Sequence, residues 1–202
     1  HLAAKSGGIG VSKNNFQATL LTDNLKMMIN ILENSKNSKV KKVILTLSSG
    51  MYPPNAKMPF KENSIHQGEV EQGSYGYFFA KRLMEPSIRA YRDQYNLDVI
   101  GLVPNGIYGE NDNFSLEQGH VIPALVHKCY LCQKKKIPWE IKGSGKAKRQ
   151  FIYAGDLARL LIWCLEGYRD REPLILSGGQ ETEISIRQVV EKIKESFEFE
   201  GE

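Results

Sequence analysis

Apolar and polar positions along the chain fall into segments that predict alternating helices and strands. Apolar residues recur every three or four positions over 20–32, which is the spacing of one buried helix face. The apolar run over 43–47 follows a lysine-rich leader and stops at a Ser-Ser-Gly turn, so it predicts a buried strand. A second buried strand is predicted over 97–103. Strand, helix and strand in this order predict an α/β fold with a parallel sheet, whose ligands bind beyond the carboxyl ends of the strands.

The remaining segments extend this alternation. A glycine- and proline-containing stretch over 52–73 predicts a long loop, and the helix after it carries Pro86, which predicts a kink because proline lacks a backbone donor. The C-terminal half predicts helices beginning at His120, at an Asp156 N-cap and at a capping box of Ser185 and Gln188, with short strands over 139–142, 151–153 and 173–176.

Composition and charge narrow the class of protein. The chain has 202 residues and a formal net charge of +4, and its basic clusters over 134–136 and 146–149 lack interleaved aromatic residues. We therefore expect a local anionic ligand and no nucleic-acid partner. Three cysteines cannot all pair, and no apolar run reaches membrane-spanning length, so we expect a cytoplasmic protein without a membrane contact. The start, 1–4, lacks an initiator methionine and is typical of a strand end, which predicts a piece of a longer protein.

Tyr77 and Lys81 are the first candidates for chemistry. Residues four apart on a helix share a face, so both side chains can point into one site. A cation beside a phenol favours the phenolate, which predicts a lowered tyrosine pKa and a proton donor suited to neutral pH. Ser48 follows a predicted strand, where a hydroxyl can bind a substrate carbonyl. Together the three residues predict hydride transfer to a ketone.

Two glycine-rich stretches and a cysteine pair are weaker evidence for a functional site. Gly7-Gly8-Ile9-Gly10 lacks the full spacing of a dinucleotide loop, and 143–146 lacks the first glycine and the final hydroxyl of a phosphate loop. Both are more typical of ordinary turns. Cys129 and Cys132 have no second pair that would complete a zinc site, so buried thiols are expected and no metal is assigned.

The serine, tyrosine and lysine set resembles the extended, nucleotide-sugar branch of the short-chain dehydrogenase/reductase superfamily. Four further blocks resemble the GDP-L-fucose synthase family within it, namely 1–8, 108–114, 119–125 and 149–153. The resemblance implies a Rossmann-like, doubly wound parallel sheet that lacks its first βα units, with a small substrate-binding subdomain from the C-terminal half. It divides the chain into a partial NADP-binding domain over 1–110 and a mostly substrate-binding part over 111–202, from which about 151–165 return to the core.

By resemblance, the family uses NADPH to convert GDP-4-keto-6-deoxymannose to GDP-L-fucose as a homodimer, inverting two carbons beside the ketone and then reducing it. Catalysis would fall to Ser48, Tyr77, Lys81 and His120, the last as the acid/base of epimerisation. Residues implied at the cofactor are Ala3, Ala4, Thr46, Leu47, Ser48, Ser49, Lys81, Pro104, Asn105, Gly106, Ile107 and His120. Those implied at the GDP-linked sugar are Lys128, Lys142 and Arg149.

Four departures from the family pattern bear on function. The family carries a cysteine two residues after the active-site serine as the partner of the histidine, and Gly50 here has no side chain to move a proton. The epimerase step is therefore in doubt. The family tends to have tryptophan at Lys142 and asparagine at Gly106. The glycine-rich phosphate loop that such folds carry is absent from the 202 residues, which by themselves should bind NADPH poorly.

Two alternatives stay open at this point. One is a non-catalytic relative retained as a binding or regulatory protein. The other is a different nucleotide-sugar epimerase or dehydratase, which would share the serine, tyrosine and lysine but not Asp112-Asn113-Phe114 and the His120 block.

Overall fold

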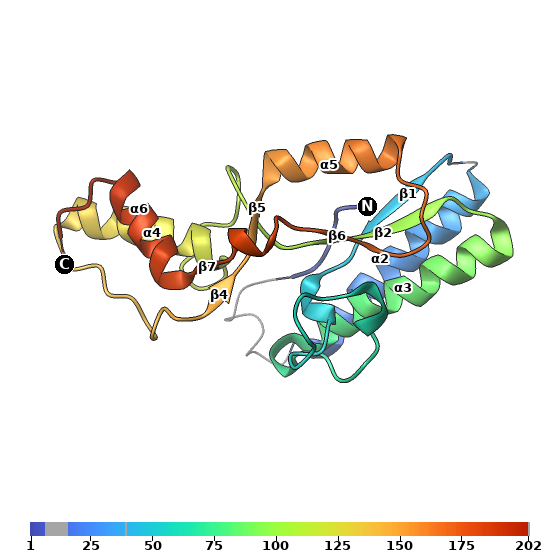
Figure 1. The fold of residues 1–202 in the computed structure, drawn as a ribbon, viewed down its shortest axis with the longest axis horizontal. Helices are drawn as coiled ribbons and strands as arrows, with labels where there is room; N and C mark the ends of the chain where they lie inside the picture. The colour runs from blue at the N-terminus through green and yellow to red at the C-terminus, as the bar shows by residue number, and fades with distance from the viewer. Residues whose placement is uncertain (7–15, 39, 202) are drawn as a thin grey trace.

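A computed structural model of the chain describes residues 1–6, 16–38 and 40–201. The larger lobe is built on a parallel sheet in the order β1-β2-β6, with β1 at Val43–Thr46, β2 at Val99–Pro104 and β6 at Leu174–Leu176. In the register, Val43 pairs with Val99 and Leu102 with Leu174. The carboxyl ends of all three strands therefore lie at one edge of the sheet (Figure 1).

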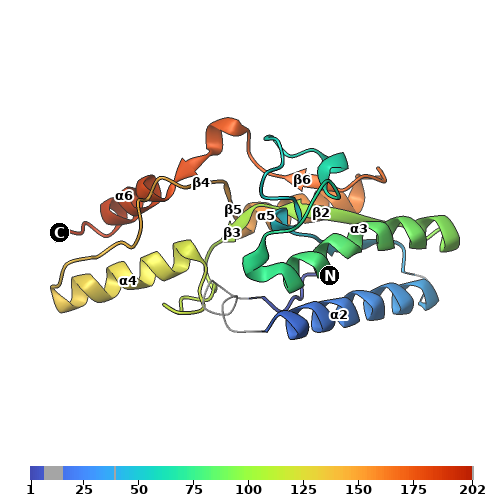
Figure 2. The same ribbon diagram turned by 90° about the horizontal axis from the view of Figure 1, so that it is seen from below.

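Helices cover both faces of this sheet. α2 (Gln17–Asn37) and α3 (Tyr75–Tyr95) lie against one face, and α5 (Ala154–Glu166) lies against the other (Figures 1 and 2). Successive residues of β2 point to opposite faces. Accordingly Val99 and Val103 pack with α2 and α3, whereas Ile100 and Leu102 pack with α5. Burial on both faces explains why these strands are continuous apolar runs in the sequence.

The smaller lobe packs α4 (Val121–Lys135) against α6 (Ile186–Ser196) around a separate apolar cluster that includes Cys129, Trp139 and Val189. Two short pairings join the lobes: β3 (Gly106–Tyr108) runs parallel to β5 (Phe151–Tyr153), and β4 (Lys148–Arg149) runs antiparallel to β7 (Ile184–Ser185). Single 3-10 turns occur at Ser49–Met51, Glu62–Ser64, Gln72–Ser74 and Gln180–Thr182.

The α/β fold class is confirmed, and so are most of the expected elements. The capping box of Ser185 and Gln188 is present at α6. Two local predictions are wrong. Residues 139–142 are not a strand, because no strand of the described chain pairs with them and Trp139 instead packs against Phe199 of the smaller lobe. Asp156 is not an N-cap, because α5 already begins at Ala154 and Asp156 lies in its first turn.

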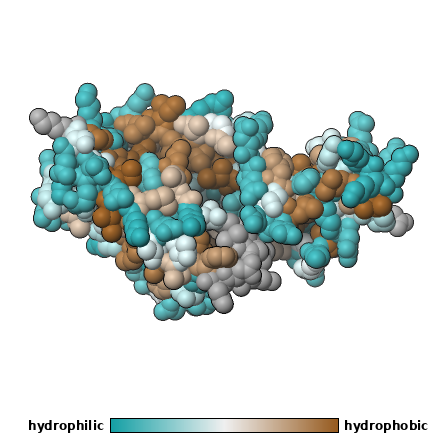
Figure 3. All heavy atoms as spheres, turned by 180° about the vertical axis from the view of Figure 1, so that it is seen from behind, coloured by the Kyte–Doolittle hydropathy of each residue, from teal (hydrophilic) through white to brown (hydrophobic). Residues whose placement is uncertain are grey.

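The expected division at residue 110 stays a prediction, although β6 also returns to the main sheet from the C-terminal half. Pro86 lies inside α3 without ending it. Within the described residues, no helix is both long and apolar enough to cross a membrane. Figure 3 shows apolar surface along the upper side of the larger lobe, where α5 lies, and exposed side chains there are Leu160, Ile162, Trp163 and Leu165.

Candidate functional site

The candidate site begins at the carboxyl end of β1. Ser48 leaves the strand with extended backbone and caps the turn at Ser49–Met51, where its Oγ accepts a hydrogen bond from the Gly50 N–H at 3.3 Å. The strand before it is fully buried, so the hydroxyl has a rigid base. The position matches the expectation that ligands bind beyond the carboxyl ends of parallel strands.

Tyr77 reaches the same point from the first turns of α3. Its hydroxyl is hydrogen-bonded to the Ser48 hydroxyl, so the predicted pair is brought together. Burial raises the pKa of Tyr77 to about 12, and the bond to Ser48 offsets only part of that increase. The expected lowering of this pKa by Lys81 is therefore wrong for the protein without ligand, because desolvation dominates and the bond to Ser48 is what opposes it. Tyr77 is a protonated donor at neutral pH.

Lys81 lies one helical turn beyond Tyr77 and is only 1% exposed. Its Nζ donates to the Thr46 carbonyl at 2.6 Å and lies 5.7 Å from the centre of the Tyr77 ring. Burial lowers the pKa of this ammonium to about 8. Within the described chain, Thr46 is its one hydrogen-bond acceptor, which leaves two of three N–H donors for a ligand. A sugar hydroxyl, such as that of a ribose, fits this unsatisfied buried donor.

Arg82 fixes the turn that carries Ser48. Its guanidinium donates from Nε to the Met51 carbonyl at 2.8 Å and from Nη1 to the Gly68 carbonyl at 2.6 Å. These bonds tie α3 to the turn and to the long loop over 52–73. Gly76 lets α3 approach α2 closely, since a Cβ there would lie 2.1 Å from the Gln17 carbonyl oxygen. Arg82 could not be predicted as a structural residue, because its burial within a helix has no local signal in the sequence.

The residues that follow β2 form a second side of the candidate site, next to the side formed by the turn after β1. Pro104 is buried, whereas Gly106 and Ile107 are exposed in β3. Asn105 donates through Nδ2 to Oε1 of Gln150 at 2.9 Å, and Nε2 of Gln150 donates to the Gly179 carbonyl at 3.1 Å. Gln150 thus joins β2, the β5 strand and the loop after β6. Gln150 belongs to the 149–153 block, but no pattern in the sequence marks it as the link between these segments.

The expected residues of the first segment lie beside β1. The His1 nitrogen donates to the Ile44 carbonyl at 2.7 Å, and Thr46 Oγ1 donates to the His1 carbonyl at 3.1 Å. Ala3 and Ala4 follow and are exposed. Leu47 is buried behind the turn, and Ser49 is half-buried within it. Gly7-Gly8-Ile9-Gly10 lies outside the described residues.

The other expected residues lie in the smaller lobe. His120 is exposed at the N-cap of α4, and Lys142 is exposed. Lys128 donates to the Glu140 carbonyl, and Arg149 donates to the Lys148 carbonyl at 2.7 Å. Among the described residues, no hydrogen bond, ion pair or ring contact joins these four to Ser48, Tyr77 or Lys81. Their roles remain proposals.

The cysteines are free and buried in the described structure, and burial raises the pKa of the Cys129 thiol. Across residues 1–6, 16–38 and 40–201, no three His, Cys, Asp or Glu side chains gather as metal ligands would.

The family to which the chain belongs can be read from its similarity to known proteins. Residues 1–176 match the model of the NAD dependent epimerase/dehydratase family, which is most of the chain. The chain belongs to this family. Its three-stranded sheet and the Ser48, Tyr77 and Lys81 cluster are thus parts of an epimerase/dehydratase fold, and the expected Rossmann-like class is confirmed.

Three members of the epimerase/dehydratase fold illustrate the likeness. GDP-L-fucose synthase of Dictyostelium discoideum is 40% identical over 201 residues, which is 100% of this chain and 62% of that protein. The crystal structure of a GDP-L-fucose synthetase from Naegleria fowleri bound to NADP has a TM-score of 0.92 and 36% identity, covering 98% of this chain and 61% of that one. A GDP-mannoheptose C4 reductase from Campylobacter jejuni with NADP bound has a TM-score of 0.85 and 28% identity, over 98% and 69% of the two chains. The 202 residues thus span about three fifths of the length of the fucose synthase relatives.

Proposed function

We propose that the intact protein is an NADPH-dependent enzyme of GDP-L-fucose synthesis that reduces the ketone of a GDP-linked 4-keto-6-deoxyhexose. The family reaction, by resemblance, converts GDP-4-keto-6-deoxymannose to GDP-L-fucose through epimerisation and reduction. Reduction is the step that the site supports best.

One observation carries this proposal: a protonated Tyr77 hydroxyl hydrogen-bonded to Ser48, with the buried Lys81 ammonium beside its ring. A ketone that takes the place between the two hydroxyls receives a hydrogen bond from Ser48 and the proton of Tyr77. The Lys81 cation lies close enough to stabilise the phenolate that remains. Reduction therefore consumes one hydride at the carbonyl carbon and one proton at its oxygen.

NADPH, when bound, supplies the hydride. Lys81 fits it, because its two remaining N–H donors can bind the hydroxyls of a ribose. The wall of Pro104, Asn105, Gly106 and Ile107 would lie along the nicotinamide side, where the side chain of Asn105 is held by Gln150. Ala3, Ala4, Thr46, Leu47, Ser49 and His120 are proposed to complete the cofactor site.

A GDP-linked sugar is the proposed substrate. Lys128, Lys142 and Arg149 place three cations on the smaller lobe, and a forked guanidinium suits a diphosphate. The likeness to GDP-L-fucose synthases and to a GDP-mannoheptose C4 reductase supports this class of substrate.

The test uses the intact protein with GDP-4-keto-6-deoxymannose and NADPH, followed by the loss of reduced-cofactor absorbance. Tyr77→Phe removes the donated proton, so kcat should fall by about 10²- to 10⁴-fold while the melting midpoint changes little. Because the Tyr77 ring is retained, cofactor binding by fluorescence titration serves as the control. A Tyr77→Phe protein with undiminished kcat would refute the role given to this hydroxyl.

We also propose that the protein is a cytoplasmic homodimer that pairs through α2 and α3. Exposed apolar side chains on these helices support pairing, among them Ile29 and Leu83, which are 49% and 44% exposed. Light scattering of the intact protein should give twice the chain mass, and Leu83→Lys should shift it toward the monomer. Imaging of the tagged protein tests the compartment.

A further inference from the structure

Gly50 and Phe78 meet beside the site, and the Phe78 ring lies where a Cβ at position 50 would be placed. A Cβ placed on Gly50 would lie 2.0 Å from Cε1 and 2.4 Å from Cζ of Phe78. Real Cβ atoms essentially never approach other atoms so closely. The edge of the Phe78 ring therefore occupies the volume that a side chain at position 50 would need.

The backbone at Gly50 has little freedom to move away from the ring. On one side its N–H donates to Ser48 Oγ. On the other side, the carbonyl of the fully buried Met51 accepts from Nε and Nη2 of Arg82 at 2.8 and 2.5 Å. A larger residue at position 50 must therefore displace the Phe78 ring.

This contact flanks the reacting groups. Gly50 follows Ser48 by two residues, and Phe78 follows Tyr77 directly. The rings of Tyr77 and Phe78 meet edge to face, with centroids 5.4 Å apart and planes at 64°. The wall next to the proposed ketone position is therefore made of a bare backbone and a phenyl edge.

Inverting a carbon beside a ketone requires a proton to leave one face and another to arrive on the opposite face. A positioned acid/base group on each face performs this exchange. Ser48 and Tyr77 are already engaged with each other at the ketone oxygen position, and Lys81 is bonded to Thr46. Gly50 and Phe78 carry no group that exchanges protons. His120, the other expected acid/base, lies at the N-cap of α4 without a described contact to Ser48, Tyr77 or Lys81, and it would serve one face only. The resemblance places an acid/base cysteine at position 50, and this chain fills that volume with carbon.

We propose that Gly50 and Phe78 form an apolar wall that confines this site to reduction of the ketone and leaves the two neighbouring carbons without proton exchange. The proposal rests on the proposed function. The balance is one hydride to the carbonyl carbon and one proton from Tyr77 to the oxygen, and no C–H bond of the neighbouring carbons breaks. An L-fucose-configured product then requires a separate epimerising reaction upstream, which supplies a substrate already inverted at both carbons.

The first experiment tests the wall by stability alone. Gly50→Ala should lower the melting midpoint of the intact protein by roughly 3–10 °C, because it overpacks the contact. Phe78→Ser in the same chain should remove that penalty, so that the double variant melts no lower than Phe78→Ser alone. Phe79→Ser is the matched control, since the next ring contacts Arg82 instead and should leave the Gly50→Ala penalty unchanged. A Gly50→Ala protein that melts like the wild type would refute the steric contact.

The second experiment tests the chemistry in deuterium oxide. GDP-4-keto-6-deoxymannose is incubated with the intact protein, with and without NADPH, and deuterium at the two carbons beside the ketone is followed by NMR. Wild type should exchange no faster than the enzyme-free sample, and the reduced product should keep the configuration of the substrate at both carbons. Exchange in the wild type as fast as NADPH oxidation would overturn the proposal.

Restoring a proton-transfer group completes the test. Gly50→Cys with Phe78→Ser should exchange deuterium at least tenfold faster than wild type, whereas Phe78→Ser alone should not. A folded double variant without exchange would show that the wall is not what prevents epimerisation. Failure of the proposed function has a different signature, namely no NADPH oxidation by wild type with the keto sugar, while the melting measurements still test the wall.

Discussion

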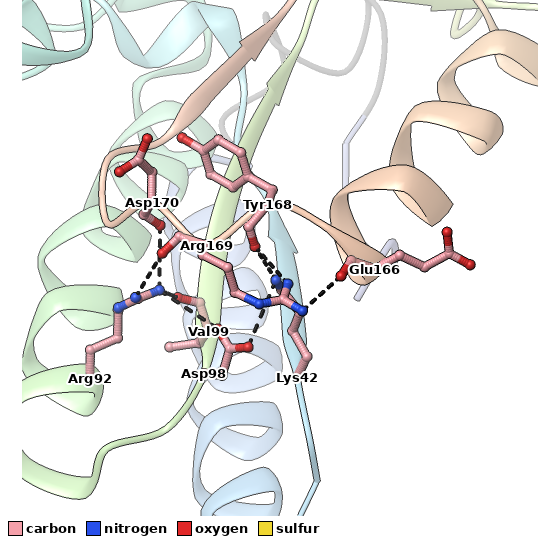
Figure 4. Close-up of polar contacts among 8 residues, drawn as sticks. All are labelled: Lys42, Arg92, Asp98, Val99, Glu166, Tyr168, Arg169 and Asp170. Atoms are coloured by element: carbon pink, nitrogen blue, oxygen red, sulfur yellow. Dashed lines mark hydrogen bonds and ion pairs between the residues drawn. The ribbon is translucent and has the colours of Figure 1, made fainter.

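The two ends of the central sheet handle buried cations in opposite ways. At the carboxyl ends of the strands, Lys81 is buried with one carbonyl as its partner and with no carboxylate among the described residues. At the amino ends, Lys42 and Arg92 both lie near Asp98, at 3.7 and 3.8 Å (Figure 4). The first end holds a cation without a carboxylate, whereas at the second end two cations share the carboxylate of Asp98.

The cluster of Lys42, Arg92 and Asp98 at the amino ends holds separate segments together, and we call it the latch. Arg92 of α3 donates to the Val99 carbonyl at 2.9 Å and to the Arg169 carbonyl at 3.3 Å, and Lys42 donates to the Tyr168 carbonyl. In Figure 4 these side chains converge from α3, from the residue before β1 and from the loop between α5 and β6. Three segments far apart in the sequence are thereby held at one point. Burial lowers the pKa of Lys42, but Asp98 opposes this effect, and within the described part of the chain no carboxylate does so for Lys81.

This difference indicates where the fold gives up stability for chemistry. An ammonium with spare donors is costly to bury but ready to bind a ligand, as is typical of functional sites. A cation that is fully bonded to carbonyls and a carboxylate stabilises the native state instead. Substitutions at the two ends should therefore change activity and stability independently.

Lys81→Met should have the largest effect and separate the two properties. Removing the ammonium should lower kcat/KM for ketone reduction by about 10²-fold or more, because the phenolate of Tyr77 loses its stabilising charge. The free energy of unfolding should rise by about 1–2 kcal/mol, since a buried charge is replaced by an apolar side chain of similar length. Steady-state kinetics and urea unfolding measure both. A destabilised Lys81→Met protein would contradict the idea that this charge costs stability.

Arg92→Met should do the reverse. Several carbonyls lose a donor in a largely buried site, so the free energy of unfolding should fall by about 2–3 kcal/mol. The kcat/KM per folded molecule should stay within about twofold, because the latch lies at the opposite end of the sheet. Arg171→Met is the matched control. Its ion pair with Asp93 is exposed on both sides, so its loss should change stability by less than about 0.5 kcal/mol.

Sequence patterns predicted the candidate site at the carboxyl ends of the strands better than they predicted the latch at the amino ends. The apolar runs of β1 and β2 are continuous because both faces are buried, and Ser48 could be placed by the point where the first run stops. Tyr77 and Lys81 could be paired by helical spacing. The latch joins Lys42, Arg92 and Tyr168, whose proximity depends on the order of strands and has no local signal.

The sequence predictions that failed have similar causes. The strand expected over 139–142 failed because pairing depends on a neighbouring strand, and Trp139 found an aromatic partner instead. The lowered pKa expected for Tyr77 failed because spacing gives the neighbouring charge but not the depth of burial. The Phe78 edge over Gly50 was missed for the same reason, since it depends on how α3 approaches the turn after β1.

A change of pH should produce the smallest effect and reveal the same asymmetry without a substitution. The folded-state pKa of Lys81 is lowered to about 8 from 10.5, so between these values the unfolded chain binds more protons than the folded one. Stability from this group therefore rises with pH, by about 1 kcal/mol between pH 7 and pH 9, and activity that needs the cation falls over the same range. Tyr77, with a pKa of about 12, stays protonated throughout and does not contribute to the fall in activity.

The measurement is kcat/KM and urea unfolding at intervals from pH 7 to 9.5. Lys81→Met is the control, and it should lose the Lys81 component of both trends. Parallel falls in activity and stability in the wild type would mean that Lys81 is not the titrating group.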